Sequence, residues 1–277
     1  MQIKNHEEKL FEAIYSSVVE NMLNICKQSD IDFIIDKLGK NNKFLKSICL
    51  LPFWFYDCFE NENGVDLQNE LFILGKANLQ AWVAYTLYDY IRDGKIEKIY
   101  INLSMSVANI MLQKSIKDFY SLVDNDKNKI NIINNLLNTV DTYYLNNKTI
   151  EDIHYHFKHM CDNSYKKSIG ASIVAIIITW LLGNEVNSNN HLETLEFFKN
   201  YLNARQLSDD EEDVVDDMLN NIYTPATFLM RAQYGSDYIR TMMRSRIDMS
   251  MRLAHDSLRN IAFFDYEKFI ELYVKEC

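Results

Sequence analysis

Apolar residues recur every three to four positions along most of the chain, which is the spacing of a helix with one buried face. A second kind of segment, residues 168–182, is apolar on nearly all sides, so it is expected to be a helix at the centre of a bundle. The pattern predicts further helices at 10–22, 71–88, 130–140, 195–219, 227–247 and 264–274.

Residues that break helices are scarce. The 277 residues include 7 glycines and 2 prolines, and alternating strand patterns between tight turns are nearly absent. No repeat of fixed period and no long polar linker divides the sequence. The chain is therefore predicted to be one all-α domain over residues 1–277, a bundle of roughly ten helices.

Composition and charge exclude several classes of protein. Hydrophobic residues make up 48% of the chain, enough for a sizeable core, so disorder is not expected. The net charge of −10 argues against a protein that grips nucleic-acid phosphates, since that needs an excess of Lys and Arg. It does not exclude local anion binding, because Mg²⁺ held by carboxylates reverses the sign of a site.

The expected location follows from the cysteines and the apolar runs. The five cysteines are scattered and form no CxxC, so neither a disulfide framework nor a zinc site is indicated. The longest apolar run is shorter than the roughly 20 residues that a membrane span needs, and no apolar signal core follows the first Met. A cytoplasmic protein without a membrane span is predicted.

Two carboxylates stand at the end of the helix predicted over 71–88. Asp89 and Asp93 are four residues apart, so their side chains leave the same helix face. Such a pair is usually a solvated surface pair. Here the preceding turns of that face carry Trp82 and Tyr85, which are large and apolar, and this favours a position beside a cavity.

A second acidic cluster lies in the segment 195–219. Seven of the nine residues 209–217 are acidic, and Asp209, Asp213 and Asp217 follow one another at one-turn spacing. Acidic runs are commonly solvated faces. A row of oxygen ligands on one helix face also suits Mg²⁺ better than zinc. If two such helices faced each other, they could hold divalent ions and, through them, a diphosphate leaving group.

The second cluster resembles a known motif. Gln206-x-x-Asp209-Asp210-x-x-Asp213 fills every position of the QxxDDxxD motif of polyprenyl diphosphate synthases, members of the class I isoprenoid (terpenoid) synthases. Asp213-x-x-x-Asp217 is also similar to a DxxxD of the squalene and phytoene synthase branch, which is likewise followed by Ile-Tyr-x-Pro.

Two further segments extend the resemblance in the same order along the chain. The segment from Asp89 to Asp93 resembles the family's first motif, DDxxD, with Tyr90 in place of its second aspartate. Lys167-Ser168, before the apolar segment, is similar to the family's Lys-Thr pair. Together the resemblance covers roughly residues 70–225 and implies an isoprenoid synthase-like helical fold with a central cavity.

The resemblance also implies roles for these residues. The metal-binding and catalytic residues would be Asp89, Asp93, Asp209 and Asp213. Asp210 and Asp217 would be further metal ligands or would support them. Lys167 and Arg205 would neutralise the diphosphate, and Gln206 would orient an aspartate. Several Mg²⁺ ions and a small-molecule prenyl diphosphate are the expected cofactor and substrate, and homodimers are common in the family.

Three functions remain open at this point. The first is a terpenoid synthase that ionises one allylic diphosphate, because the chain lacks the paired arginines that follow the first motif in condensing enzymes. The second is a prenyltransferase that condenses prenyl diphosphates. The third, kept open by Tyr90, is a non-catalytic helical partner subunit.

The size of the expected cavity follows from three aromatic residues. Trp82, Tyr85 and Tyr88 are candidates for its lining, although an aromatic stripe at helical spacing is more often ordinary core. Lining by these side chains would restrict the substrate to short prenyl chains, about ten to fifteen carbons, since Trp82 stands about two turns from Asp89, roughly 10 Å at 1.5 Å per residue.

Overall fold

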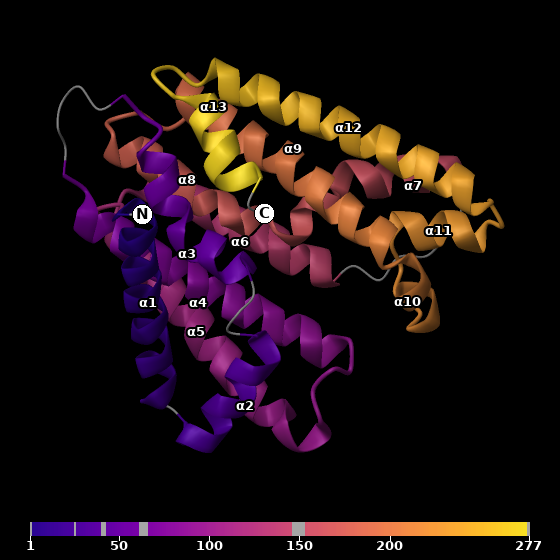
Figure 1. Cartoon of the computed structure of the whole chain (residues 1–277), viewed down its shortest axis with the longest axis horizontal. Helices are drawn as coiled ribbons and strands as arrows, with labels where there is room; N and C mark the ends of the chain where they lie inside the picture. The colour runs from indigo at the N-terminus through magenta and orange to yellow at the C-terminus, as the bar shows by residue number, and fades with distance from the viewer. Residues whose placement is uncertain (1, 25, 40–42, 61–65, 146–152, 276–277) are drawn as a thin grey trace. The chain divides into compact units, whose positions relative to one another are not determined.

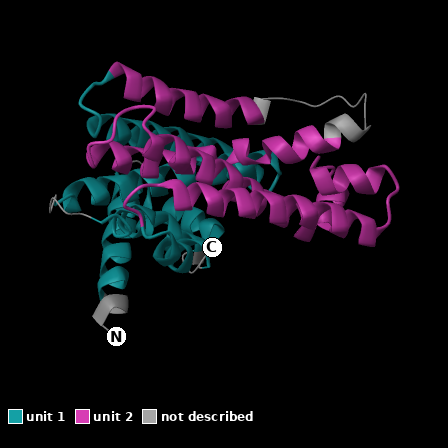
Figure 2. Cartoon of the chain, turned by 90° about the horizontal axis from the view of Figure 1, so that it is seen from above, with its two compact units in different colours: residues 1–126, 265–277 teal, residues 127–264 magenta. Residues whose placement is uncertain are grey.

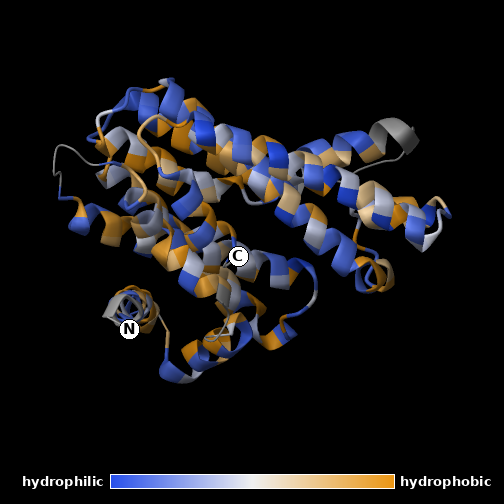
Figure 3. Ribbon diagram, turned by 45° about the horizontal axis from the view of Figure 1, so that its top comes forward, coloured by the Kyte–Doolittle hydropathy of each residue, from blue (hydrophilic) through white to orange (hydrophobic). Residues whose placement is uncertain are grey.

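The computed structural model describes residues 2–24, 26–39, 43–60, 66–145 and 153–275 (Figure 1). Within these ranges the regular structure is helical throughout, with thirteen α-helices and four short segments of 3₁₀- or π-helix, η1 to η4. The predicted all-α fold class is confirmed. Figure 3 shows hydrophilic and hydrophobic residues on the same helices, as amphipathic packing requires.

The chain divides into two compact units (Figure 2). Unit 1 comprises residues 1–126 together with 265–277, and unit 2 comprises residues 127–264. Each unit has its own elements and is described by itself. The single domain expected over residues 1–277 stays a prediction.

Unit 1 is built around a long helix, α4, which packs against α1, α3 and α5. Its elements are α1 (Gln2–Leu23), α2 (Gln28–Leu38), α3 (Lys43–Tyr56), α4 (Gln68–Arg92), η1 (Lys98–Tyr100), α5 (Ile101–Ser121), α13 (Tyr266–Phe269) and η4 (Ile270–Val274). The helix predicted over 10–22 corresponds to α1, and the helix predicted over 71–88 corresponds to α4.

The contact between α3 and α4 is unusually close. A Cβ atom added to Gly75 of α4 would lie 2.6 Å from the backbone oxygen of Cys49 in α3. One turn further, the Asn78 amide donates a hydrogen bond to the Ile48 carbonyl at 2.9 Å. On the other side of α4, Ser115 of α5 donates to the Ala77 carbonyl at 2.8 Å. Small and polar side chains therefore let α4 approach both neighbours.

The last residues of the chain return to α3. The backbone N–H of Asp265 donates to the Cys58 carbonyl at 2.7 Å, and Lys268 Nζ donates to the Asp57 carbonyl at 2.6 Å. The rings of Phe269 and Phe55 meet edge to face with their centroids 5.3 Å apart. These contacts make α13 part of unit 1 despite its distance along the sequence.

Unit 2 contains the remaining elements. They are α6 (Lys127–Leu145), α7 (Ile153–Asn163), η2 (Ser164–Lys167), η3 (Ile169–Ala171), α8 (Ser172–Leu181), α9 (Asn189–Glu212), α10 (Val214–Leu219), α11 (Pro225–Arg231) and α12 (Ser236–Asn260). Every residue from Ser172 to Trp180 in α8 is buried, as the all-round apolar pattern predicted. Helix α9 packs against α8 and α12.

Two predicted helices prove to be pairs of helices. The segment expected to be helical over 195–219 begins earlier, as α9, and is interrupted at Asp213 before α10. The segment expected over 227–247 is divided into α11 and α12, because Gln233 adopts a left-handed backbone conformation (φ 62°) and Gly235 caps α12. Thr224 caps the start of α11, where Pro225 occupies the first turn.

No helix among the described residues combines the length and the apolar character that a bilayer crossing requires.

Candidate active site

The first acidic segment lies at the carboxyl end of α4 in unit 1. The side chains of Asp89 and Asp93 are 21% and 14% exposed, and Arg92 bridges them. Its Nη2 lies 3.0 Å from Asp89 Oδ1, and its Nε lies 3.1 Å from Asp93 Oδ1. Lys95 Nζ lies 3.6 Å from Asp93 Oδ2. The two carboxylates therefore share one guanidinium, which offsets the repulsion between like charges one turn apart.

The end of α4 is fixed by its backbone. Gly94 has a φ of 69°, and the N–H of Lys95 donates to the Tyr90 carbonyl at 2.8 Å, as in a Schellman ending. Asp93 is the residue at which the helix stops, and its N–H still bonds to the Asp89 carbonyl at 2.8 Å. This geometry sets both carboxylates within one turn at the helix end.

The predicted lining residues precede this segment on α4. Trp82, Tyr85 and Tyr88 are all half-buried. The rings of Tyr85 and Tyr88 lie edge to face with centroids 6.1 Å apart, and the Tyr88 hydroxyl donates to Asn109 Oδ1 of α5 at 2.6 Å. Tyr88 is thus oriented by α5. Trp82 and Tyr85 lie closer to the direction of Asp89 around the helix.

The second acidic segment lies at the end of α9 in unit 2, and one of its aspartates is buried. Asp210 is 6% exposed, and Gln206 Nε2 donates to its Oδ1 at 2.8 Å. Burial raises the pKa of Asp210 to about 7. The Gln206 hydrogen bond and Lys167 act in the opposite direction, while Asp217 and Asp209 add to the rise. A carboxyl group with this pKa is partly protonated at neutral pH.

The other aspartates of this segment are more accessible. Asp209 and Asp213 are exposed, and Asp217 is half-buried. The pKa of Asp209 is raised, chiefly by partial desolvation, while Arg205 and Lys167 lower it. Both cations therefore offset part of the negative charge of the acidic segment.

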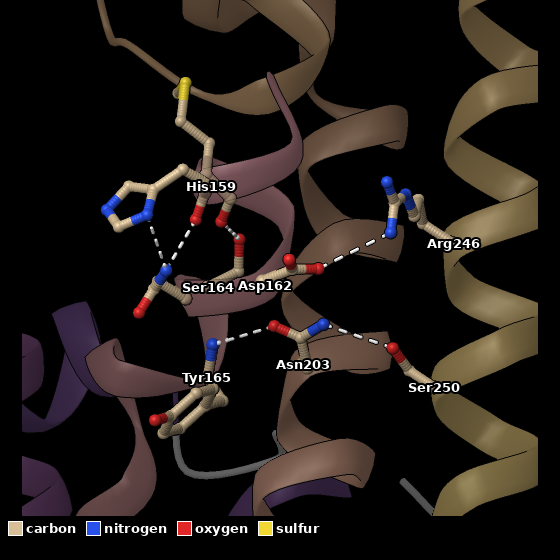
Figure 4. Close-up of polar contacts among 9 residues, drawn as sticks. His159, Asp162, Ser164, Tyr165, Asn203, Arg246 and Ser250 are labelled. Carbon is tan, nitrogen blue, oxygen red and sulfur yellow. Dashed lines mark hydrogen bonds and ion pairs between the residues drawn. The ribbon is translucent and has the colours of Figure 1, made fainter. Parts of the chain in front are cut away.

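The segment that carries Lys167 is tied to α9 and α12 (Figure 4). The backbone N–H of Tyr165 donates to Asn203 Oδ1 at 3.2 Å, and Asn203 Nδ2 donates to Ser250 Oγ at 3.1 Å. Arg246 of α12 reaches Asp162 of α7 at 3.4 Å. Neither Asn203 nor Ser250 stood out in the sequence, because single polar residues in helices usually face solvent.

The acidic segments carry donors for a metal ion but no assembled metal site within the described residues. Among the described residues, no group of three or more His, Cys, Asp or Glu side chains converges into a ready metal site. The donors in both acidic segments are carboxylate oxygens, which suit Mg²⁺. The donor type thus fits magnesium, while neither segment alone forms a complete site. That the two segments face each other stays a prediction from the sequence.

One comparison with known proteins bears on the fold. No family model matches the chain, and no curated protein matches it. Among solved structures it is similar to a geranyltransferase from Legionella pneumophila, with a TM-score of 0.62 and 14% identity. The likeness covers 99% of this chain and 96% of the other. The chain therefore has a helical, isoprenoid synthase-like fold.

Proposed function

We propose that the protein is a Mg²⁺-dependent enzyme that ionises a short allylic prenyl diphosphate. The observation that carries the proposal is the hydrogen bond from Gln206 to the buried Asp210 at the end of α9, with Lys167 and Arg205 acting on the same acidic segment. Burial of a carboxyl group costs folding free energy, and carboxyl groups with perturbed pKa values cluster at functional sites. The fold shared with a geranyltransferase supports this interpretation.

In the proposed reaction, the bond between the allylic carbon and the diphosphate oxygen breaks, and the diphosphate leaves with the electron pair. Bound Mg²⁺ would supply charge neutralisation for the leaving group. The residues that would hold it are Asp89, Asp93, Asp209 and Asp213. Asp210 and Asp217 would support these ligands, and Gln206 would keep Asp210 in place.

The remaining cations of the site would act on the substrate directly. Lys167 and Arg205 would attract the diphosphate oxygens, and the Arg205 guanidinium can make two parallel hydrogen bonds to them. The allylic cation would then lose a proton, react with its own double bonds or take up water. Trp82 and Tyr85 would face it with their aromatic rings, which attract a cation by about 0.5–2 kcal/mol.

The first test is incubation of the protein with geranyl, farnesyl or geranylgeranyl diphosphate and Mg²⁺, with products identified by mass spectrometry. We expect hydrocarbon or alcohol products and free diphosphate from the ten- and fifteen-carbon substrates, and none after chelation of the metal. Absence of turnover with every substrate, despite Mg²⁺-dependent binding of pyrophosphate, would contradict catalysis and favour a non-catalytic partner subunit.

A prenyltransferase that joins two prenyl diphosphates is the second candidate, and the geranyltransferase likeness favours it. The same assay separates the two candidates when isopentenyl diphosphate is added. A product longer by five carbons would identify the condensing reaction. Unchanged products would support ionisation of a single allylic diphosphate.

The proposed lining predicts a change in chain-length preference. Gly75 and Asn78 lie on the same face of α4 and contact α3. From Trp82 to Asp89 this face spans roughly 10 Å at 1.5 Å per residue. Trp82→Ala or Tyr85→Ala should shift kcat/KM toward the twenty-carbon substrate, while Tyr85→Phe, which keeps the ring, should not. An unchanged preference in both alanine variants would reject this lining.

A further inference from the structure

A buried amide joins three elements of unit 2. Asn203 of α9 is 8% exposed, and both ends of its side chain are used. Its Oδ1 accepts from the Tyr165 N–H of η2, and its Nδ2 donates to Ser250 Oγ of α12, which is also buried (Figure 4). Hydrogen bonds at both ends of a buried amide hold its partners in one arrangement.

The Tyr165 N–H needs a partner from outside its own helix. It lies in the first turn of η2, where backbone N–H groups have no acceptor within the helix. The residue before η2, Asn163, makes no capping hydrogen bond, since its side chain donates to the His159 carbonyl at 2.7 Å. Asn203 therefore acts as a cap supplied by α9 and ties η2 to that helix.

The segment held in this way carries Lys167, the last residue of η2. Asn203 and Asp210 are seven residues apart on α9, so they lie on the same helix face, with Gln206 between them. Helix α9 packs against η2, so Lys167 and the acidic segment lie on neighbouring elements. One face of α9 thus holds both the anchor of η2 and the buried Asp210.

We propose that Asn203 is a positioning residue that holds η2 against α9, so that Lys167 stands beside the acidic segment and meets the diphosphate there. The inference rests on the proposed function, and it adds a residue outside the motifs. Ser250 of α12 accepts a hydrogen bond from the Asn203 amide nitrogen. This bond fixes the plane of the Asn203 amide, so that its oxygen points at the Tyr165 N–H of η2.

The test is a double-mutant cycle in the full-length chain, with pyrophosphate and Mg²⁺ as the probe and calorimetry as the measurement. Asn203→Ala should weaken pyrophosphate binding roughly tenfold, and Lys167→Ala should weaken it at least as much. The double variant should bind no more weakly than Lys167→Ala, because Asn203 acts through that residue. Ser250→Ala, which leaves the bond to Tyr165 in place, should weaken binding less than Asn203→Ala.

A matched control separates positioning from stability. Trp180→Phe removes another buried hydrogen bond to α9, the one from Trp180 Nε1 to His191 Nδ1 at 3.1 Å, near the opposite end of the helix. It should lower the melting temperature and leave pyrophosphate affinity unchanged. An equal loss of affinity in this variant, or additive effects of Asn203→Ala and Lys167→Ala, would overturn the positioning role.

The same data distinguish failure of this inference from failure of the proposed function. If Lys167→Ala weakens binding while Asn203→Ala and Ser250→Ala leave it unchanged, the positioning role is wrong and the diphosphate site stands. If the unmodified chain binds no pyrophosphate in the presence of Mg²⁺, the proposed function itself is wrong.

Discussion

Asp209→Asn is expected to lower kcat/KM by about a hundredfold or more, since it removes a charged metal ligand from the proposed site. The substitution keeps the shape of the side chain and removes one negative charge. Asp209 is exposed, and the hydrogen bond that holds the buried Asp210 comes from Gln206. The fold should therefore survive the substitution. Steady-state kinetics at several Mg²⁺ concentrations should show that the variant needs more Mg²⁺ to reach half of its maximal activity.

Asp216→Asn is the matched control for this prediction. Asp216 is exposed on α10, lies outside the QxxDDxxD pattern and undergoes the same chemical change. Its variant should keep both activity and metal dependence. Similar losses in the two variants would mean that only the summed negative charge of the segment matters, and the assignment of Asp209 as a ligand would be wrong.

The helices that the sequence predicted best, such as α1 and α8, are those whose buried residues are mainly apolar. Helix α8 is the clearest example, because nine consecutive buried residues leave no polar face to confuse the pattern. Helix α5 was not predicted, since its buried face includes Ser104 and Ser115, whose small polar side chains weaken the apolar period. Ser115 is buried because its hydroxyl bonds to the backbone of α4, which only the packed structure shows.

The residues of the candidate site also differ in how far the sequence could predict them. Gln206 and Asp210 could be selected because they fill positions of the QxxDDxxD motif, and the structure joins them by a hydrogen bond. Asn203 could not, because a lone asparagine in a helix carries no signal in one sequence. Its position seven residues before Asp210 on the same face is a clue only after Asp210 is known to be buried.

The break between α11 and α12 had a different cause. The apolar period continues across residues 232–235, so periodicity alone favoured one helix. The left-handed conformation of Gln233 ends that helix through its backbone, and glutamine has no special preference for this conformation. Turns made by ordinary residues are therefore the least predictable part of this chain.

Gly75→Ala is expected to destabilise the protein by about 3 kcal/mol, even though alanine is the better helix former. The added Cβ would lie 2.6 Å from the Cys49 carbonyl oxygen and 2.9 Å from Ile14 Cδ1. The isoleucine methyl can move at small cost. The carbonyl belongs to the backbone of α3, whose movement would also strain the hydrogen bond from Asn78 to Ile48. The loss of close packing should outweigh the gain in helix propensity of about 1 kcal/mol.

Gly170→Ala introduces the same methyl group where it fits. Its Cβ would meet only Val140 Cγ2 at 3.7 Å, which is an ordinary contact. The free energy of unfolding should therefore change by less than about 0.5 kcal/mol. Gly75→Ala should lower the melting temperature by roughly 6–12 °C under the same conditions. Equal melting temperatures for the two variants would show that α3 and α4 separate easily and that their close contact at Gly75 contributes little to stability. A large loss confined to Gly75→Ala would instead support this contact as a rigid part of unit 1.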